Sequence, residues 1–470
     1  MYTTGKGNKK TTCGSRRKKV FRNSKKLLTN KRVYDIIYSR GEGNRTEQNN
    51  SGSRYIKRRS SMEQLDFAWS NGGYKKGKKP ELFLVLDCET ATLPFVGNME
   101  LTTEQKKMVS ISKPLIYDLG WKIIDRKLNV YAQHSILIQE TFFVPAVFNT
   151  AYYREKRPQY MEKYKAGDIV SMKWNEAIKL LIEELQYVKY CTAYNAMFDF
   201  KKAIPFTEAY IKNLYSADYQ QWEDKQRKIC QYIADGGKFE NPNEFDNLNF
   251  ILRNVNYPMI DIWGIACNRL INKDKYKANC VASGQLSRSG LYFKTSAEST
   301  FRYLLKDNTF IESHTAFEDV EIECEILIKA VKKGKLIEGI QYFPFQELGT
   351  TFDYIYGRLR KNGKPYHTAE EIDNLIEIMY NRWLEYETAN PFANKLCDYI
   401  YLLEAFKHQH YKKINKSRFA KTYCNMLKRQ IDRKIKYSEN LVEGGESWYR
   451  VISEIQDLHE QLDYYTNYIN

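Results

Sequence analysis

Three short acidic motifs carry the residues of this chain that could perform chemistry. The first holds Asp87 and Glu89, the second ends at Asp199, and the third runs from His314 to Asp319. Four carboxylates supply the hard oxygen ligands that a pair of Mg²⁺ or Mn²⁺ ions takes in proteins. A nearby histidine suits the general base that removes a proton from water at neutral pH. Together these groups are what two-metal hydrolysis of a phosphodiester requires.

The spacing of the first motif adds to this interpretation. Asp87 and Glu89 lie two residues apart, so on a β-strand both side chains project from the same face. Such a pair can bind two cations, with Asp87 bridging them. The alternatives are a chance pair at a solvated strand end, a capping or surface role for Asp199 and a structural role for His314, and the joint occurrence of the motifs weakens each of them.

In this order the motifs D-x-E-T, N-A-x-F-D and H-x-A-x-x-D resemble those of the DEDDh family of 3′→5′ exonucleases. The resemblance covers residues 81–330, and each motif is weak alone. It implies a ribonuclease-H-like α/β fold, with His314 as the general base and Asp319, rather than its neighbour Glu318, as the last metal ligand. The implied catalytic and metal-binding acids are Asp87, Glu89, Asp199 and Asp319.

The resemblance also implies the cofactors and the substrate contacts. Two Mg²⁺ or Mn²⁺ ions are expected, and the expected reaction releases nucleoside 5′-monophosphates from the 3′ ends of DNA, single-stranded ends above all. Thr90, Asn195 and Phe198 are expected to contact the substrate. For Phe198, packing in the core is the favoured alternative to stacking on a base.

Two other functions stay open. The motifs serve RNA as well as DNA, because two-metal hydrolysis ignores the 2′-hydroxyl unless a specific contact reads it. A non-catalytic nucleic-acid-binding protein on the same scaffold would be expected to have lost an acid, and none is missing. No polymerase domain is recognisable, so a role in proofreading, as opposed to trimming of DNA ends, predicts a DNA polymerase or replisome partner.

Hydrophobic periodicity predicts the elements that must position these residues. Strands are predicted at 81–87, 114–124, 130–138, 189–194 and 259–262, and helices at 174–188, 263–272, 297–306 and 316–332. This order predicts a mixed sheet flanked by helices, beginning with an antiparallel meander, with the ligands gathered at strand ends. Asp261 is predicted to cap the helix that follows it.

The rest of the chain is predicted to be largely helical. An exonuclease-like domain is expected at 81–335, with an insertion at about 205–257 that contains helices at 207–215 and 219–234. Residues 350–470 are expected to form a helical C-terminal domain of unassigned role, with helices at 370–387, 391–409, 416–437 and 447–468. The basic stretch 407–436 fits a nucleic-acid-binding face or a solvated helix face equally well.

The net charge of +17 lies in the first 80 residues. They contain 22 Lys and Arg but only five Asp and Glu, whereas the remaining 390 residues contain 52 of each. This composition predicts a disordered basic arm, with a short helix at 25–38, that binds phosphates without sequence preference. Deleting residues 1–70 is expected to leave the catalytic centre intact and to lower the affinity for DNA.

Composition also argues against several classes of protein. The nine cysteines are scattered and never spaced C-x-x-C, which disfavours a disulfide framework and a zinc ribbon. No apolar run approaches the ~20 residues of a membrane helix, and no secretory signal is recognisable, so an intracellular, cytoplasmic protein without a membrane partner is expected. Low proline with abundant Lys, Asn, Ile and Tyr is typical of an AT-rich genome and indicates a phage or other mobile-element origin.

Overall fold

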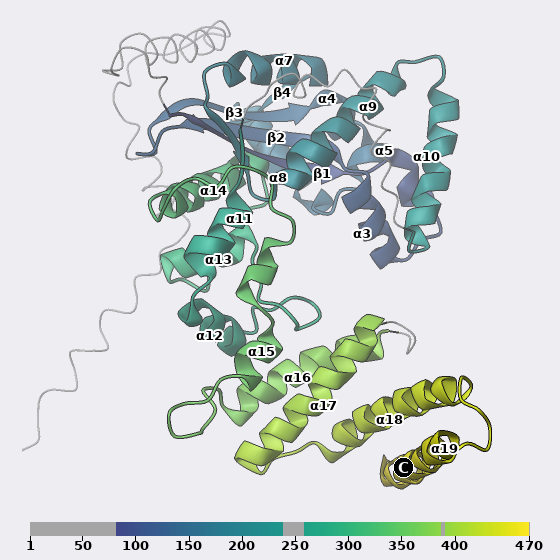
Figure 1. The fold of residues 1–470 in the computed structure, drawn as a ribbon. Helices are drawn as coiled ribbons and strands as arrows, with labels where there is room; N and C mark the ends of the chain where they lie inside the picture. The colour runs from purple at the N-terminus through teal and green to yellow at the C-terminus, as the bar shows by residue number, and fades with distance from the viewer. Residues whose placement is uncertain (1–80, 238–257, 387–390, 470) are drawn as a thin grey trace, which may run out of the picture. The chain divides into compact units, whose positions relative to one another are not determined.

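The computed structural model describes residues 81–237, 258–386 and 391–469, and within them the strands form one six-stranded sheet (Figure 1). The strand order is β4-β3-β2-β1-β5-β6. The strands are β1 (Phe83–Ala91), β2 (Leu115–Ile124), β3 (Val130–Ile138), β4 (Val170–Met172), β5 (Tyr190–Ala193) and β6 (Met259–Asp261). β1 to β3 are antiparallel, β4 is parallel to β3, and β5 and β6 run parallel to β1. The sheet is therefore mixed, as the sequence predicts.

The first three strands form the predicted antiparallel meander. β2 is buried at every position, which suits its place between β1 and β3. The turn between β2 and β3 is held by the Asp125 carboxylate, which accepts hydrogen bonds from the backbone N–H groups of Lys127 (2.7 Å) and Asn129 (3.0 Å). The predicted end of β1 at Asp87 is wrong. The strand continues to Ala91, because pairing with β2 extends as far as Leu115.

Most predicted helices around the sheet are confirmed. They include α7 (Trp174–Leu185), α9 (Ile204–Leu214), α10 (Tyr219–Ala234), α13 (Ala297–Leu305) and α14 (Ala316–Val331). The helix predicted at 263–272 is confirmed, but only its first half is α-helical: α11 (Ile262–Ala266) passes without a break into a π-helical turn, Cys267–Ile271. The predicted cap of α11 is confirmed, since the Asp261 carboxylate accepts a hydrogen bond from the Trp263 N–H at 3.1 Å.

Apolar side chains of β1 alternate between two buried layers, one on each face of the sheet. Leu84 and Leu86 pack in the layer that also contains side chains of α7, α9 and α10. Phe83 and Val85 pack in the layer formed with α11, α13 and α14. The period of two in a strand thus fixes which helices each position of β1 faces.

The C-terminal helices are α15 (Thr351–Tyr356), α16 (Ala369–Leu384), α17 (Pro391–Tyr411), α18 (Lys416–Ser438) and α19 (Glu446–Ile469). The four long ones were predicted from their periodicity, and α15 was not. Ile372 and Leu403 belong to the same buried cluster as Val85, so the hydrophobic core continues past residue 350. α18 and α19 pack against each other around a smaller cluster that contains Ile431 and Val451.

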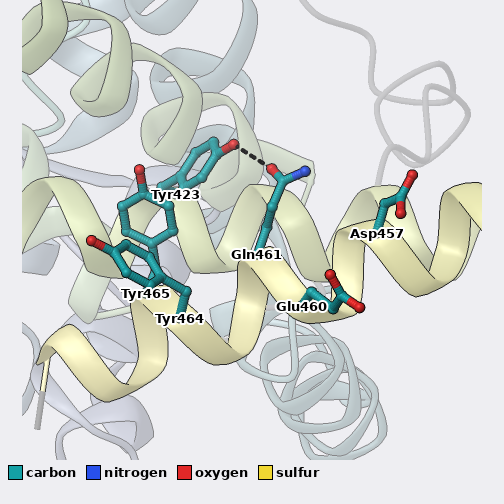
Figure 2. A pocket seen from close by; sticks show the side chains of 6 residues that line it. All are labelled: Tyr423, Asp457, Glu460, Gln461, Tyr464 and Tyr465. Carbon is teal, nitrogen blue, oxygen red and sulfur yellow. Dashed lines mark hydrogen bonds between the residues drawn. The ribbon is translucent and has the colours of Figure 1, made fainter.

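A pocket lies on the α18–α19 hairpin (Figure 2). Its lining consists of Tyr423, Asp457, Glu460, Gln461, Tyr464 and Tyr465. The Tyr423 hydroxyl donates a hydrogen bond to Gln461 Oε1 at 3.0 Å, so two of these polar groups satisfy each other. None of the residues predicted to form a catalytic or substrate site lines this pocket.

Three predictions fall outside the described residues: the basic arm at 1–80, its helix at 25–38, and the part of the insertion at 238–257. In the part of the chain that the structure describes, no helix has the length and apolar character needed to cross a membrane.

Candidate active site

Glu89, His314 and Asp319 form the tightest group of predicted site residues. One ligand atom from each lies within 4.8 Å of the other two. Glu89 comes from β1, His314 from the loop before α14, and Asp319 from the first turn of α14. Residues from two separate sequence motifs therefore meet at one point of the fold.

Asp87 faces the same side of the sheet as Glu89. It continues the alternation of Phe83 and Val85, both of which pack in the layer that contains α14. Asp87 is half-buried, and its electrostatic neighbours include Asp199 and Glu89. It lies outside the tightest group but within the same cluster of acids.

Two residues of β2 allow α14 to begin next to these acids. Gly120 pairs with Asp87, and a Cβ atom added to it would lie 2.7 Å from the backbone of both Ala316 and Phe317. Asp118 pairs with Glu89, and its Oδ2 accepts a hydrogen bond from the Ala316 N–H at 2.9 Å. A carboxylate at a helix N-terminus satisfies an otherwise unpaired N–H group and interacts favourably with the helix dipole. The start of α14 is therefore positioned by the absence of a side chain at Gly120 and by the carboxylate of Asp118.

The acids raise one another's pKa values. Burial raises the pKa of Asp87 well above its usual range, and repulsion from Asp199 and Glu89 adds to this. Burial likewise raises the pKa of Asp319, with repulsion from Glu312 and Asp87. The pKa of Glu89 is raised by burial and by Asp118. Ionisation of each of these carboxylates is therefore energetically unfavourable unless a cation balances the negative charge.

The donor set fits a divalent cation. Asp319 Oδ1 is buried and has no hydrogen-bond partner among the described residues, although buried carboxylate oxygens are normally paired. Glu89 and Asp319 offer hard oxygen ligands, and His314 offers a ring nitrogen. Asp87 adds a further carboxylate on the same face of β1. The carboxylates would coordinate Mg²⁺ or Mn²⁺ through oxygen, which leaves the His314 nitrogen free to accept a proton.

His314 has a ring and a backbone that are both held in place. Its φ angle of 51° lies in the left-handed region, which non-glycine residues seldom adopt. The imidazole stacks on the Tyr153 ring, with the centroids 4.2 Å apart and the planes inclined by 13°. Its Nδ1 lies 3.7 Å from the Glu312 carboxylate. Burial lowers the pKa of His314, and the nearby Lys156 ammonium lowers it further, so the neutral ring is favoured at neutral pH.

Two side chains hold the loop that carries His314. The Lys156 ammonium donates a hydrogen bond to the Ser313 carbonyl, and the Tyr160 hydroxyl donates one to the His314 carbonyl at 3.3 Å. Both donors come from the segment before α7, more than 150 residues earlier in the chain. The positive φ of His314 thus persists because its neighbours determine it.

Asp199 contacts β1 at Cys88, the residue between Asp87 and Glu89. It begins a π-helical turn, Asp199–Ala203, and such turns are frequent at functional sites. Its Oδ1 accepts a hydrogen bond from the Cys88 thiol at 3.0 Å. Burial raises the pKa of Asp199 to about 7, although the hydrogen bond from Cys88 opposes the shift. Asp199 therefore neighbours Asp87 but does not join the tightest group.

Glu318 differs from Asp319 in its partners. Its carboxylate lies 2.7 Å from the Lys163 ammonium and accepts a hydrogen bond from the Thr315 hydroxyl at 2.8 Å. Burial raises the pKa of Glu318, but the hydrogen bonds from Lys163 and Ser313 outweigh it and leave the pKa lowered. Glu318 is thus an ion-paired carboxylate, whereas Asp319 keeps an unpaired oxygen.

The three predicted substrate contacts have different surroundings in the structure. Thr90 is half-buried and follows a shift in the β1–β2 register, directly after Glu89. Asn195 has a φ angle of 70°, and its N–H donates a hydrogen bond to Asp261 Oδ1 at 3.2 Å. Phe198 is partly buried and packs against the layer of α7 and α9, which fits the core alternative.

Several residues at the site were not singled out from the sequence. Glu323 lies one helical turn after Asp319, accepts a hydrogen bond from the Tyr194 N–H at 3.2 Å, and has a pKa raised by burial and by Asp87. Its i+4 spacing from Asp319 was a usable signal. Glu312, two residues before His314, was equally visible. Tyr153 and Lys156 gave no signal, because only the folded chain brings them to His314.

No known protein family, curated protein or solved structure matches the chain. Its chemistry is therefore inferred from the site itself. The site combines an oriented imidazole, whose pKa is lowered, with a cluster of buried and half-buried carboxylates. This arrangement can bind divalent cations and deprotonate a water molecule.

Proposed function

We propose that this protein is a metal-dependent 3′→5′ exonuclease that hydrolyses the terminal phosphodiester bond of DNA and releases nucleoside 5′-monophosphates. The observation that carries the proposal is the convergence of Glu89, His314 and Asp319 within 4.8 Å, beside the half-buried Asp87. A structural cluster of acids would be paired with Lys or Arg, as Glu318 is paired with Lys163.

Each side chain has a distinct role in this proposal. Asp87, Glu89 and Asp319 would hold the cations, and Asp199, beside Cys88, would supply a further carboxylate. When bound, two Mg²⁺ or Mn²⁺ ions supply Lewis acidity and stabilise negative charge on the attacked phosphate and the leaving oxygen. His314 removes the proton from the attacking water, which requires the neutral ring that its lowered pKa favours. Tyr153, Lys156 and Tyr160 orient His314.

The polarity and the substrate class rest on the resemblance of the three motifs to the DEDDh family. The six-stranded mixed sheet flanked by helices is compatible with the ribonuclease-H-like fold of that family. Proofreading beside a DNA polymerase, as opposed to trimming of free DNA ends, would place this activity in a larger assembly.

The test is a degradation assay with DNA labelled at either end, single-stranded and duplex, and with RNA of the same sequence. We expect Mg²⁺-dependent release of mononucleotides from the 3′ end of DNA, abolished by EDTA and by Asp87→Ala. Full activity of a folded Asp87→Ala protein would overturn the proposal. Hydrolysis of RNA alone would select the RNA alternative, and binding without hydrolysis would select the non-catalytic one.

A further inference from the structure

A row of aromatic rings leads from His314 to the protein surface. The Tyr153 ring stacks on the imidazole of His314 at 4.2 Å, and the Tyr152 ring meets the Tyr153 ring edge-on at 4.8 Å. Tyr153 is half-buried, whereas Tyr152 is 72 % exposed. Tyr152 thus presents a large apolar ring to solvent two ring contacts from the proposed general base.

Cations flank the same row of rings. The Lys156 ammonium lies 4.9 Å from the centre of the Tyr153 ring, and the Lys107 ammonium of α3 (Thr103–Ser112) lies 5.7 Å from the centre of the Tyr152 ring. Arg154 is exposed directly after the two tyrosines. Within the described ranges, neither Lys107 nor Arg154 has a carboxylate in ion-pair distance, so both charges are available to a ligand.

These features differ from those expected of a purely structural aromatic cluster. A structural cluster buries its rings, as the Tyr117 and Phe142 rings do deeper in the same region. An exposed ring beside unpaired cations instead fits a ligand with flat apolar faces and negative charges. Nucleic-acid strands provide both, since bases stack on aromatic side chains and phosphates contact Lys and Arg.

The row also fits an unpaired strand better than a duplex. Inside a duplex, both faces of a base are already covered by its neighbours, so stacking on a tyrosine requires a base that has left the helical stack. Because the row ends at His314, a base on Tyr152 would belong to a nucleotide close to the bond that is cut.

We propose that Tyr152 and Tyr153, flanked by Lys107, Arg154 and Lys156, form the surface along which single-stranded DNA reaches the acid cluster, with a base near the 3′ end stacked on Tyr152. This inference rests on the proposed exonuclease function and adds to it the strandedness of the substrate. It assigns Tyr152 to substrate binding and not to the chemical step.

The test measures binding and hydrolysis separately in the full-length protein. Binding of a short single-stranded DNA is measured by fluorescence anisotropy with Ca²⁺, a cation that takes the same type of oxygen ligands as Mg²⁺. A second DNA carries 2-aminopurine near its 3′ end, because stacking quenches the fluorescence of this base. Blunt duplex DNA and RNA of the same sequence are the comparison ligands.

Tyr152→Ala should raise the Kd for single-stranded DNA about 5- to 150-fold, the range given by loss of one base–aromatic stack, and should remove the 2-aminopurine quenching. Tyr152→Phe keeps the ring and should preserve both. Tyr215→Ala is the matched control, because Tyr215 follows α9 and is also 72 % exposed. It should leave affinity and quenching unchanged.

Unchanged affinity and quenching in Tyr152→Ala would overturn the inference, as would an equal loss of affinity for duplex DNA or a loss confined to RNA. Mg²⁺-dependent hydrolysis is measured on the same proteins. If the protein hydrolyses DNA but Tyr152→Ala does not change binding, only the inference about Tyr152 is overturned. If Tyr152→Ala weakens binding but no protein hydrolyses DNA, only the proposed exonuclease activity is overturned.

Discussion

Neighbouring carboxylates on one helical turn have opposite environments in this protein. Glu318 is ion-paired with Lys163, whereas Asp319 Oδ1 is buried without a hydrogen-bond partner among the described residues. If Asp319 binds a cation, Asp319→Asn should lower the hydrolysis rate at least about 100-fold, because a metal ion supplies several kcal/mol of transition-state stabilisation. Release of labelled mononucleotides in Mg²⁺ measures this, with circular dichroism to verify folding.

The matched variant is Glu318→Gln, which changes the adjacent carboxylate without touching Asp319. It should keep most of the activity, since a partly exposed ion pair contributes little to stability. Equal losses in the two variants would contradict the assignment of the metal to Asp319.

The imidazole of His314 gives a prediction for pH dependence. Because burial lowers its pKa, the neutral base should persist below the ordinary histidine range, and activity should fall only when the pH drops below about 6.5. His314→Gln should lower kcat about 10²- to 10⁴-fold, the usual contribution of a general base, and should lose this acid limb. The measurement is a pH–rate profile at saturating Mg²⁺. An unchanged acid limb in His314→Gln would assign that limb to another group.

At the scale of elements, the contact between β2 and α14 sets the geometry of the site. Gly120 has no room for a side chain, since an added Cβ would lie 2.7 Å from the Ala316 and Phe317 backbone. Gly120→Ala should therefore displace the start of α14, cost about 1–3 kcal/mol of stability and reduce activity. Thermal unfolding and the hydrolysis assay measure the two effects.

Gly97→Ala is the control for this substitution. Its added Cβ would meet only the Thr150 side chain, at 3.7 Å, which is an ordinary van der Waals contact. It should leave stability and activity close to those of the unchanged protein. If Gly120→Ala were as well tolerated as Gly97→Ala, the approach of α14 to β2 would not limit the site.

Elements with strong periodicity were predicted from the sequence, and those that depend on context were not. The strand at 130–138 and the helix at 219–234 have the bounds that their patterns indicate. β4 was missed because three residues carry no periodic signal, and its strand conformation depends on pairing with β3. The predicted end of β1 was wrong because the extension to Ala91 depends on pairing with β2.

At the scale of the whole molecule, the proposed metal ligands and general base could be predicted from the sequence. The residues that hold them in position could not. The spacing of the acids and the histidine within their motifs identifies Asp87 and His314 as candidate site residues from the sequence alone. By contrast, Tyr153 and Lys156 meet His314 only through the packing of segments about 160 residues apart. The shared core of Val85 and Leu403 is likewise a property of the folded chain. Local patterns cannot encode such contacts.

The concentration of buried acids should also dominate the stability of the metal-free protein. Burial raises the pKa of Asp199 to about 7, of Glu312 to about 7 and of Asp118 to about 6, and it also raises that of Asp87 well above its usual range. These carboxyls bind protons more tightly in the folded than in the unfolded chain, where their pKa is about 4. The stability they contribute is therefore full below about pH 4 and is lost as the pH rises through about 7.

In EDTA, the melting temperature should consequently fall between about pH 5 and pH 8, and Mg²⁺ or Mn²⁺ should restore it, because a ligand that binds only the folded state stabilises it. Asp319→Asn removes one of the repelling charges, so it should melt higher than the unchanged protein in EDTA at the upper end of this range and gain less from the metal. Glu318→Gln, which loses an ion pair instead, should not melt higher. Scanning calorimetry with and without EDTA measures all three proteins. A melting temperature that rises with pH in EDTA would mean that the carboxylates of the cluster do not repel one another. Without such repulsion, electrostatics would not favour binding of a divalent cation at this site.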